Sequence, residues 1–364
     1  MQSFFDRDQI EGMALDNRAG PRLMLAAMAQ QKTAFGLTLS NRALITLGLK
    51  PKTLIDMAVK AEDSGAIEAV WVGDSILSKP RLECIPLLGA IAAQTSQLRL
   101  GVACMATIAQ RNPVLLALQW ASLDVLSGGR TWLAACMGYP ASQHPMAAKE
   151  LEVMGIASKE RPGRLEEMIQ ALRRLWSDDH ASFHGKYYSF DDVNLIPKPV
   201  QRPCPIYIAG TPRSSGIGER GVERALRRIA RYADGWMTNQ IELSLFQDYA
   251  ARLRKMLTEE GRDSDRFKTV LYYGISVNRD REQAFREAKT FLDAYYLKDF
   301  SRQGVEIWNA CGPVEHCVDC LGGFIAAGVD HITIRPIGQN LDEQLRIYLE
   351  EVLPALAGLG KGSV

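Results

Sequence analysis

Residues 98–136, LRLGVACMATIAQRNPVLLALQWASLDVLSGGRTWLAAC, contain the repeating unit that decides the fold. The apolar run at 98–105 predicts a buried strand, and RTWLAAC at 130–136 predicts a second one. Between them, Pro113 suits the first turn of a helix, and the SGG at 127–129 ends that helix. A strand, a helix and a further strand in this order predict a parallel βαβ unit.

The same alternation continues on both sides of this unit. Eight right-handed strand–helix crossovers in succession predict a closed TIM (β/α)₈ barrel of the α/β class. The rival architecture, an open doubly wound sheet, needs a GxGxxG turn after an early strand, and none follows the first two. The predicted strands are 34–39, 68–73, 98–105, 130–136, 205–209, 235–238, 269–277 and 331–336. The predicted helices are 52–64, 83–95, 113–127, 161–176, 219–233, 243–260, 281–298, 313–327 and 341–357.

Two segments interrupt the alternation, and one precedes it. Residues 138–160 show no clear periodicity, whereas 180–200 hold aromatic residues and prolines and predict a side sheet or loop. We therefore expect a barrel over 34–364 with insertions after the fourth and fifth strands. Residues 1–33 are expected to form an N-terminal extension.

Composition excludes several classes of partner. The net charge of +1 gives no basic excess for nucleic acid or an anionic membrane surface. No apolar run reaches the roughly 20 residues that span a bilayer, and no signal-peptide pattern opens the chain. We expect a cytoplasmic protein. Seven scattered cysteines do not predict a disulfide framework, and the cluster Cys311, Cys317 and Cys320 lacks a second CxxC pair, so we predict no metal site.

Chemistry in a TIM barrel is located at the carboxyl ends of the strands. Asp74 follows the second strand and is predicted as either a catalytic base or a structural cap. His144 follows the fourth strand and is either a general base or a solvated loop histidine. AGTPRSSGIGERG at 209–221 follows the fifth strand, and its glycines, hydroxyls and arginines suit a phosphate, the alternative being a flexible polar loop.

Several ordered stretches carry a resemblance to a known family. They are VWVGDSILSKPR (70–81), the run 98–130, KERPGRLEEMIQALRRLW (159–176), FHGKYYSFDDVNLIPKPVQ (183–201), ALRRIARYADGW (225–236) and GPVEHCVDC with AAGVDHITIRP (312–336). Together they resemble the bacterial luciferase-like monooxygenases, some of which use FMN and others the deazaflavin coenzyme F420. The resemblance covers about residues 34–357.

This resemblance implies a flavin that lies across the strand ends, with its phosphate in the loop after the fifth strand. The third strand of the family often carries a non-prolyl cis peptide against the flavin ring. Cys136 falls where bacterial luciferase has a reactive thiol and is our third catalytic candidate, beside the alternative of a small core residue. The implied cofactor-binding residues are Ala103, Cys104, Met105, Tyr139, Gly210, Thr211, Arg213, Ser214 and Ser215.

The resemblance also implies a function. We expect a two-component monooxygenase, in which a separate flavin reductase supplies reduced FMN that reacts with O₂ beside a small organic substrate. The alternative is an F420-dependent hydride-transfer enzyme, which needs no O₂. A second alternative is a non-catalytic flavin-binding protein. The family is usually dimeric, so we expect a homodimer that meets through the helices at 83–95 and 113–127.

Overall fold

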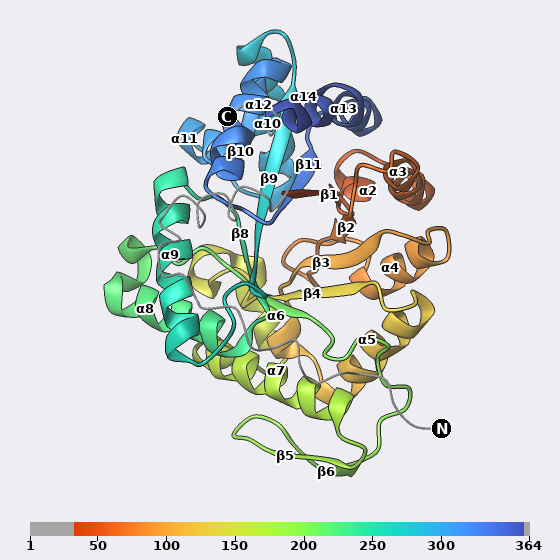
Figure 1. The fold of residues 1–364 in the computed structure, drawn as a ribbon, viewed down its shortest axis with the longest axis vertical. Helices are drawn as coiled ribbons and strands as arrows, with labels where there is room; N and C mark the ends of the chain where they lie inside the picture. Colours follow the sequence, from red (N-terminus) through yellow and green to blue (C-terminus); the bar gives the residue numbers. More distant parts are fainter. Residues whose placement is uncertain (1–32, 360–364) are drawn as a thin grey trace, which may run out of the picture. The chain divides into compact units, whose positions relative to one another are not determined.

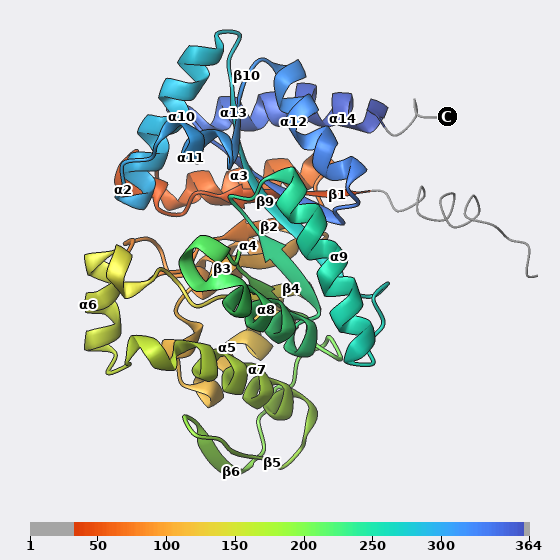
Figure 2. The same cartoon turned by 90° about the vertical axis from the view of Figure 1, so that its left-hand side faces the viewer.

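Eight parallel strands close into a barrel, as predicted (Figures 1 and 2). The structure is a computed structural model that describes residues 33–359, with the side chains of residues 143, 214, 215, 358 and 359 left out. The expected extension over 1–33 lies outside the described residues except for Thr33. The barrel strands, each paired with the next and the last with the first, are β1 (Ala34–Leu39), β2 (Ala69–Val72), β3 (Arg99–Met105), β4 (Thr131–Ala135), β7 (Ile206–Ala209), β8 (Gly235–Thr238), β9 (Lys268–Val277) and β11 (His331–Pro336).

A ninth strand, β10 (Asn309–Gly312), extends the sheet outside the closed barrel. It pairs in parallel with residues 274–277 of β9, whereas β11 pairs with 270–275 of the same strand. With ten residues, β9 is long enough to pair with both β10 and β11. Our prediction missed β10 because its sequence, NACG, contains no β-branched or aromatic residue.

Helices surround the barrel, and local sequence explains their ends. The helix α5 begins at Pro113, and the side chain of Asn112 accepts hydrogen bonds from the amides of Val114 and Leu115. The helices are α2 (Ala43–Thr46), α3 (Pro51–Asp63), α4 (Cys84–Ala92), α5 (Pro113–Leu126), α6 (Pro145–Val153), α7 (Arg161–Ser177), α8 (Ser214–Tyr232), α9 (Leu243–Glu259), α10 (Arg281–Tyr296), α11 (Arg302–Glu306), α12 (Val314–Ala326), α13 (Leu341–Ile347) and α14 (Leu353–Leu359). Among the described residues, no helix combines the length and apolarity that crossing a bilayer requires.

The interrupting segments take definite structures. Residues 138–160 contain α6, and 180–200 contain an antiparallel hairpin of β5 (Ala181–His184) and β6 (Ser189–Val193), which is the predicted side sheet. The loop predicted at 209–221 is wrong in extent, because α8 already begins at Ser214. Gly218, with φ of +65°, interrupts the first turns of α8, and this glycine made the segment resemble a loop.

Candidate active site

A cavity of about 520 Å³ opens at the carboxyl ends of the barrel strands. Its wall combines residues at or just after the ends of β2, β3, β4, β7 and β8 with aromatic side chains from β9, from α10 and from the residue before β10. This is the end of the barrel where chemistry is located in this fold. The lining includes Gly73, Asp74, Lys79, Arg81, Ala103, Cys104, Cys136, Tyr139, Gly210, Thr211, Arg213, Met237, Tyr272, Tyr295, Tyr296, Lys298 and Trp308.

Most of the cofactor-binding residues that we predicted line this cavity. Ala103, Cys104, Tyr139, Gly210, Thr211 and Arg213 all do so. The peptide bond between Ala103 and Cys104 is cis, within the stretch where the resemblance placed one. Met105 is fully buried and is not part of the cavity wall. Ser214 and Ser215 begin α8, but their side chains lie outside the described part of the chain.

The loop after β7 is held firmly to its neighbours. The hydroxyl of Thr211 lies 2.6 Å from that of Thr238 and donates to the carbonyl of Asn239 at 2.5 Å. The carbonyl of Gly210 accepts a hydrogen bond from Trp236 Nε1 at 2.8 Å. The exposed Arg213 then leads directly into the amino terminus of α8. A fixed loop, a guanidinium and a helix amino terminus together suit a phosphate group.

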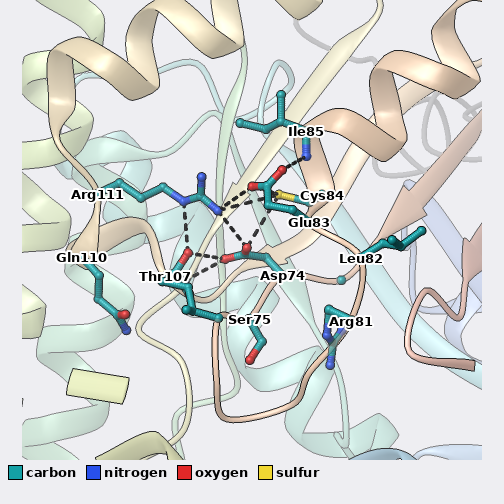
Figure 3. Close-up of polar contacts among 12 residues, drawn as sticks. Asp74, Ser75, Arg81, Leu82, Glu83, Cys84, Ile85, Thr107, Gln110 and Arg111 are labelled. Atoms are coloured by element: carbon teal, nitrogen blue, oxygen red, sulfur yellow. Dashed lines mark hydrogen bonds and ion pairs between the residues drawn. The ribbon is translucent and has the colours of Figure 1, made fainter. Parts of the chain in front are cut away.

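Asp74 is tightly engaged in a buried polar cluster beside the cavity (Figure 3). Its Oδ2 accepts hydrogen bonds from the amide and hydroxyl of Thr107 at 2.9 and 2.6 Å, and its Oδ1 lies 2.9 Å from Arg111 Nη2. Arg111 Nη2 also lies 2.9 Å from a carboxylate oxygen of Glu83. Because three donors already occupy the Asp74 carboxylate, the geometry favours a structural role over that of a free base.

Three residues of the same cluster have the spacing of possible metal ligands. Asp74, Glu83 and Cys84 each place one donor atom within 4.8 Å of the others. Arg111, however, contacts both carboxylates and places its positive charge between them. Burial lowers the pKa of Arg111, but Asp74 and the neighbouring acids outweigh it, so the pKa lies above its ordinary value. Burial also raises the pKa of the Cys84 thiol, which stays neutral. The guanidinium thus occupies the role that a cation would take.

His144 lies beside the cavity rather than in its wall. Its Nδ1 accepts a hydrogen bond from the amide of Ala147 at 3.3 Å and so caps α6, while its buried Nε2 has no partner among the described residues. Burial, followed by nearby Lys79, lowers the pKa of His144 and favours the neutral ring. The histidine lines an adjoining cavity, which shares Tyr139, Tyr296 and Lys298 with the main one. This buried capping position differs from the solvated loop that was our alternative.

Basic side chains that form no ion pair within residues 33–359 make up another part of the site. Lys79 is 8% exposed, and its ammonium nitrogen lies 4.2 Å from the ring centre of Tyr139. Arg335, at the end of β11, is fully buried among aromatic rings and donates from Nη1 to Tyr296 Oη at 2.7 Å. Its Nε and Nη2 have no partner in the described structure. Burial, and next the charge of Arg81, lowers the pKa of Lys79 well below its ordinary value.

Arg335 falls within the predicted strand 331–336 but was not among our site candidates, and neither was Lys79. The only signal for Lys79 was the run SKPR that follows the predicted second strand. A lysine in a polar loop is most often exposed, so nothing local marked this one as buried.

Cys136 is not a free thiol in this structure. It forms a disulfide with Cys104, with the two Cα atoms 5.9 Å apart, and both residues line the cavity. In this bonded form the Cys136 sulfur is not a nucleophile, and a catalytic role for its thiol stays a prediction. The other five cysteines are free.

Known proteins resemble this chain in sequence and in fold. The F420-dependent glucose-6-phosphate dehydrogenase of Nakamurella multipartita is 27% identical over 339 residues, which cover 86% of this chain and 95% of that protein. The enzyme of the same name from Amycolatopsis mediterranei is 25% identical, with 85% and 96% covered. An F420-dependent secondary alcohol dehydrogenase has a TM-score of 0.74 at 20% identity, covering 89% of this chain and 99% of that one.

A monooxygenase from Streptomyces bottropensis shares the fold as well, with a TM-score of 0.71 at 19% identity, over 88% of this chain and 99% of its own. The sequence pattern of the luciferase-like monooxygenase family matches residues 33–309. Because its relatives are oxidoreductases, the alternative of a non-catalytic binding protein is set aside. The chain belongs to the luciferase-like monooxygenase family and is an oxidoreductase.

Proposed function

We propose that this enzyme transfers a hydride between coenzyme F420 and a small organic molecule that carries a negative charge. The observation that carries the proposal is the charge of the cavity wall. Lys79, Arg81, Arg213 and Lys298 line it, whereas Asp74, the acidic residue of that wall, is already paired with Arg111. Such a wall attracts anions and disfavours a neutral or cationic occupant.

The positive charge of the cavity wall favours the more anionic of the two candidate cofactors. FMN carries one phosphate, whereas F420 extends its phosphate into a tail of further anionic groups. Relatives that align over at least 85% of this chain act with F420 by name, and this supports the same cofactor here. The FMN-dependent monooxygenase that we first expected has less support, because the monooxygenase with a similar structure shares only 19% of its residues and informs on fold alone.

The residues present fit such a cofactor. The loop 210–213 and the amino terminus of α8 suit the phosphate, and Ala103 and Cys104 provide a wall for the ring. Tyr139, Tyr296 and Trp308 give the cavity aromatic surface that excludes water. Lys79 and Arg81 are placed to hold the anionic group of the substrate. Bound F420 supplies hydride transfer, and the protein binds, orients and shields the reactants.

Binding of F420 and of FMN, each in oxidised and reduced form, tests this proposal. Quenching of tryptophan fluorescence reports binding, because Trp308 lines the cavity. We expect F420 to bind at least about tenfold more tightly than FMN, about 1.4 kcal/mol. Equal affinity or a preference for FMN would overturn the F420 assignment.

A pair of arginine variants tests whether the cofactor phosphate binds at the loop after β7. Arg213→Gln should weaken F420 binding about tenfold, since a charge-assisted hydrogen bond to phosphate is lost. Arg266→Gln is the matched control, because the Arg266 side chain is 89% exposed and does not line the cavity. An equal loss of affinity in both variants would argue against a phosphate at the loop after β7.

A further inference from the structure

The Cys104–Cys136 disulfide occupies an unusual place for a structural crosslink. It joins β3 to the residue that follows β4, and these two strands are already paired in parallel along the barrel. The pairing register shifts at Cys104, since Ala103 pairs with Ala134 and Met105 with Ala135. Cys104 is therefore an extra residue in its strand, and such irregularities often redirect a side chain next to an active site.

Both cysteines face the site rather than the interior packing between barrel and helices. They line the same cavity wall in which Ala103 and Cys104 provide a surface for the cofactor ring. By contrast, the free cysteines Cys204 and Cys311 are buried, and burial raises the pKa of each to about 12. Those thiols are inert at neutral pH. All seven cysteines lie in the described part of the chain, and the two that are oxidised are the two that border the proposed cofactor.

We propose that Cys104 and Cys136 form a two-electron redox centre that reduced F420 converts from disulfide to dithiol. The inference rests on the proposed function. A hydride passes from the reduced cofactor to one sulfur, and the S–S bond breaks. The other sulfur departs as a thiolate and takes up a proton from solvent. The cofactor releases its second hydrogen to solvent as a proton, so it is oxidised by two electrons while two thiols replace the disulfide.

This centre gives the oxidised protein a measurable electron capacity. One chain consumes one equivalent of reduced F420 in the absence of any substrate, and it consumes no more once the dithiol has formed. The reduced pair also presents a free Cys136 thiol to the cavity, which is the group that the family resemblance led us to expect there. The state of the pair therefore decides whether this wall of the cavity is nucleophilic.

The experiment is an anaerobic titration of full-length protein, isolated without thiol reductants, with chemically reduced F420. Absorbance measures the oxidised F420 that appears, and differential alkylation with peptide mass spectrometry measures thiols at each cysteine. We expect one equivalent of oxidised F420 per chain and full alkylation of Cys104 and Cys136. Wild-type protein that is first reduced with dithiothreitol and desalted should oxidise none.

Variants and controls separate the outcomes. Cys104→Ser and Cys136→Ser should each abolish F420 oxidation, while Cys320→Ser, at a half-buried free cysteine outside the cavity, should retain one equivalent. If reduced F420 quenches tryptophan fluorescence but neither F420 oxidation nor new thiols appear, the redox centre is overturned and the proposed function stands. If F420 does not bind, both the proposed function and this inference are overturned. Alkylation of both cysteines before any reductant is added would overturn the disulfide itself.

Discussion

Two clusters of charged side chains flank the same cavity and differ in how their charges are compensated. In the paired cluster of Asp74, Glu83, Thr107 and Arg111, every charge meets a partner of opposite sign or a hydrogen-bond donor (Figure 3). In the unpaired cluster of Lys79, Arg81 and Arg335, no described carboxylate lies within 4.0 Å of a basic nitrogen.

This difference in charge compensation distinguishes a cluster with a structural role from one with a binding role. A buried ion that is matched within the protein stabilises the fold, and removing its partner leaves an uncompensated charge. A buried ion that is left unmatched destabilises the fold, and a ligand of opposite charge supplies the missing partner. We infer that the paired cluster maintains the cavity and that the unpaired cluster binds what enters it.

The largest effect is expected from breaking the paired cluster. Arg111→Met leaves Asp74 buried and unpaired, and we expect the free energy of unfolding to fall by about 3–5 kcal/mol. Chemical denaturation measures this loss. The control is Arg174→Met, which removes an exposed ion pair with Asp178 and should change stability by less than about 1 kcal/mol. A similar small change in both variants would contradict the structural role of the paired cluster.

The unpaired cluster should respond in the opposite way. Lys79→Met removes a charge that forms no ion pair with the described residues, so the free energy of unfolding should stay the same or rise. The variant loses a charged contact to the substrate anion of about 1.5–3 kcal/mol, which raises KM roughly 10- to 150-fold. Steady-state kinetics and denaturation together test this. An unchanged KM, or an unfolding loss as large as that of Arg111→Met, would refute the division between the clusters.

The smallest expected effect is a pH dependence of the ligand-free protein. Burial, and then the charge of Arg81, lowers the pKa of Lys79 in the folded state below its ordinary 10.5. Below this lowered pKa, Lys79 carries its proton in both the folded and the unfolded state, and the folded state bears the full cost of a buried charge. Between the lowered pKa and 10.5 the unfolded chain binds more protons, so stability rises with pH.

The stability of wild type relative to Lys79→Met should therefore increase with pH across this window. Subtracting the unfolding free energy of the variant from that of wild type removes the contribution of groups that titrate in both proteins. Burial raises the pKa values of Tyr139 and Tyr296, so these neighbouring phenols stay neutral in most of the window. A difference that is flat from neutral pH to pH 10 would show that Lys79 is not desolvated as the structure describes.

Much of the barrel was predictable from local pattern. The bounds of β1 and β11 match our prediction at both ends, and α5 begins at Pro113 as its proline and asparagine indicate. The site was predictable in part, because polar residues after barrel strands are brought to one end of the fold. Asp74 and the loop 210–213 were found in this way. Lys79 was not, since a single sequence carries no signal for the burial of a loop lysine.

The sequence by itself determined the eight barrel strands, because the periodicity of apolar residues and the positions of Pro and Gly act within a few residues of chain. Only the tertiary structure decided which side chains meet. The bonds of Cys104 to Cys136, Asp74 to Arg111 and Tyr296 to Arg335 join residues 32, 37 and 39 positions apart. Such pairings depend on strand register and on the closure of the barrel, which no local pattern encodes. They also distinguish charges that the protein neutralises from charges that it leaves for a ligand.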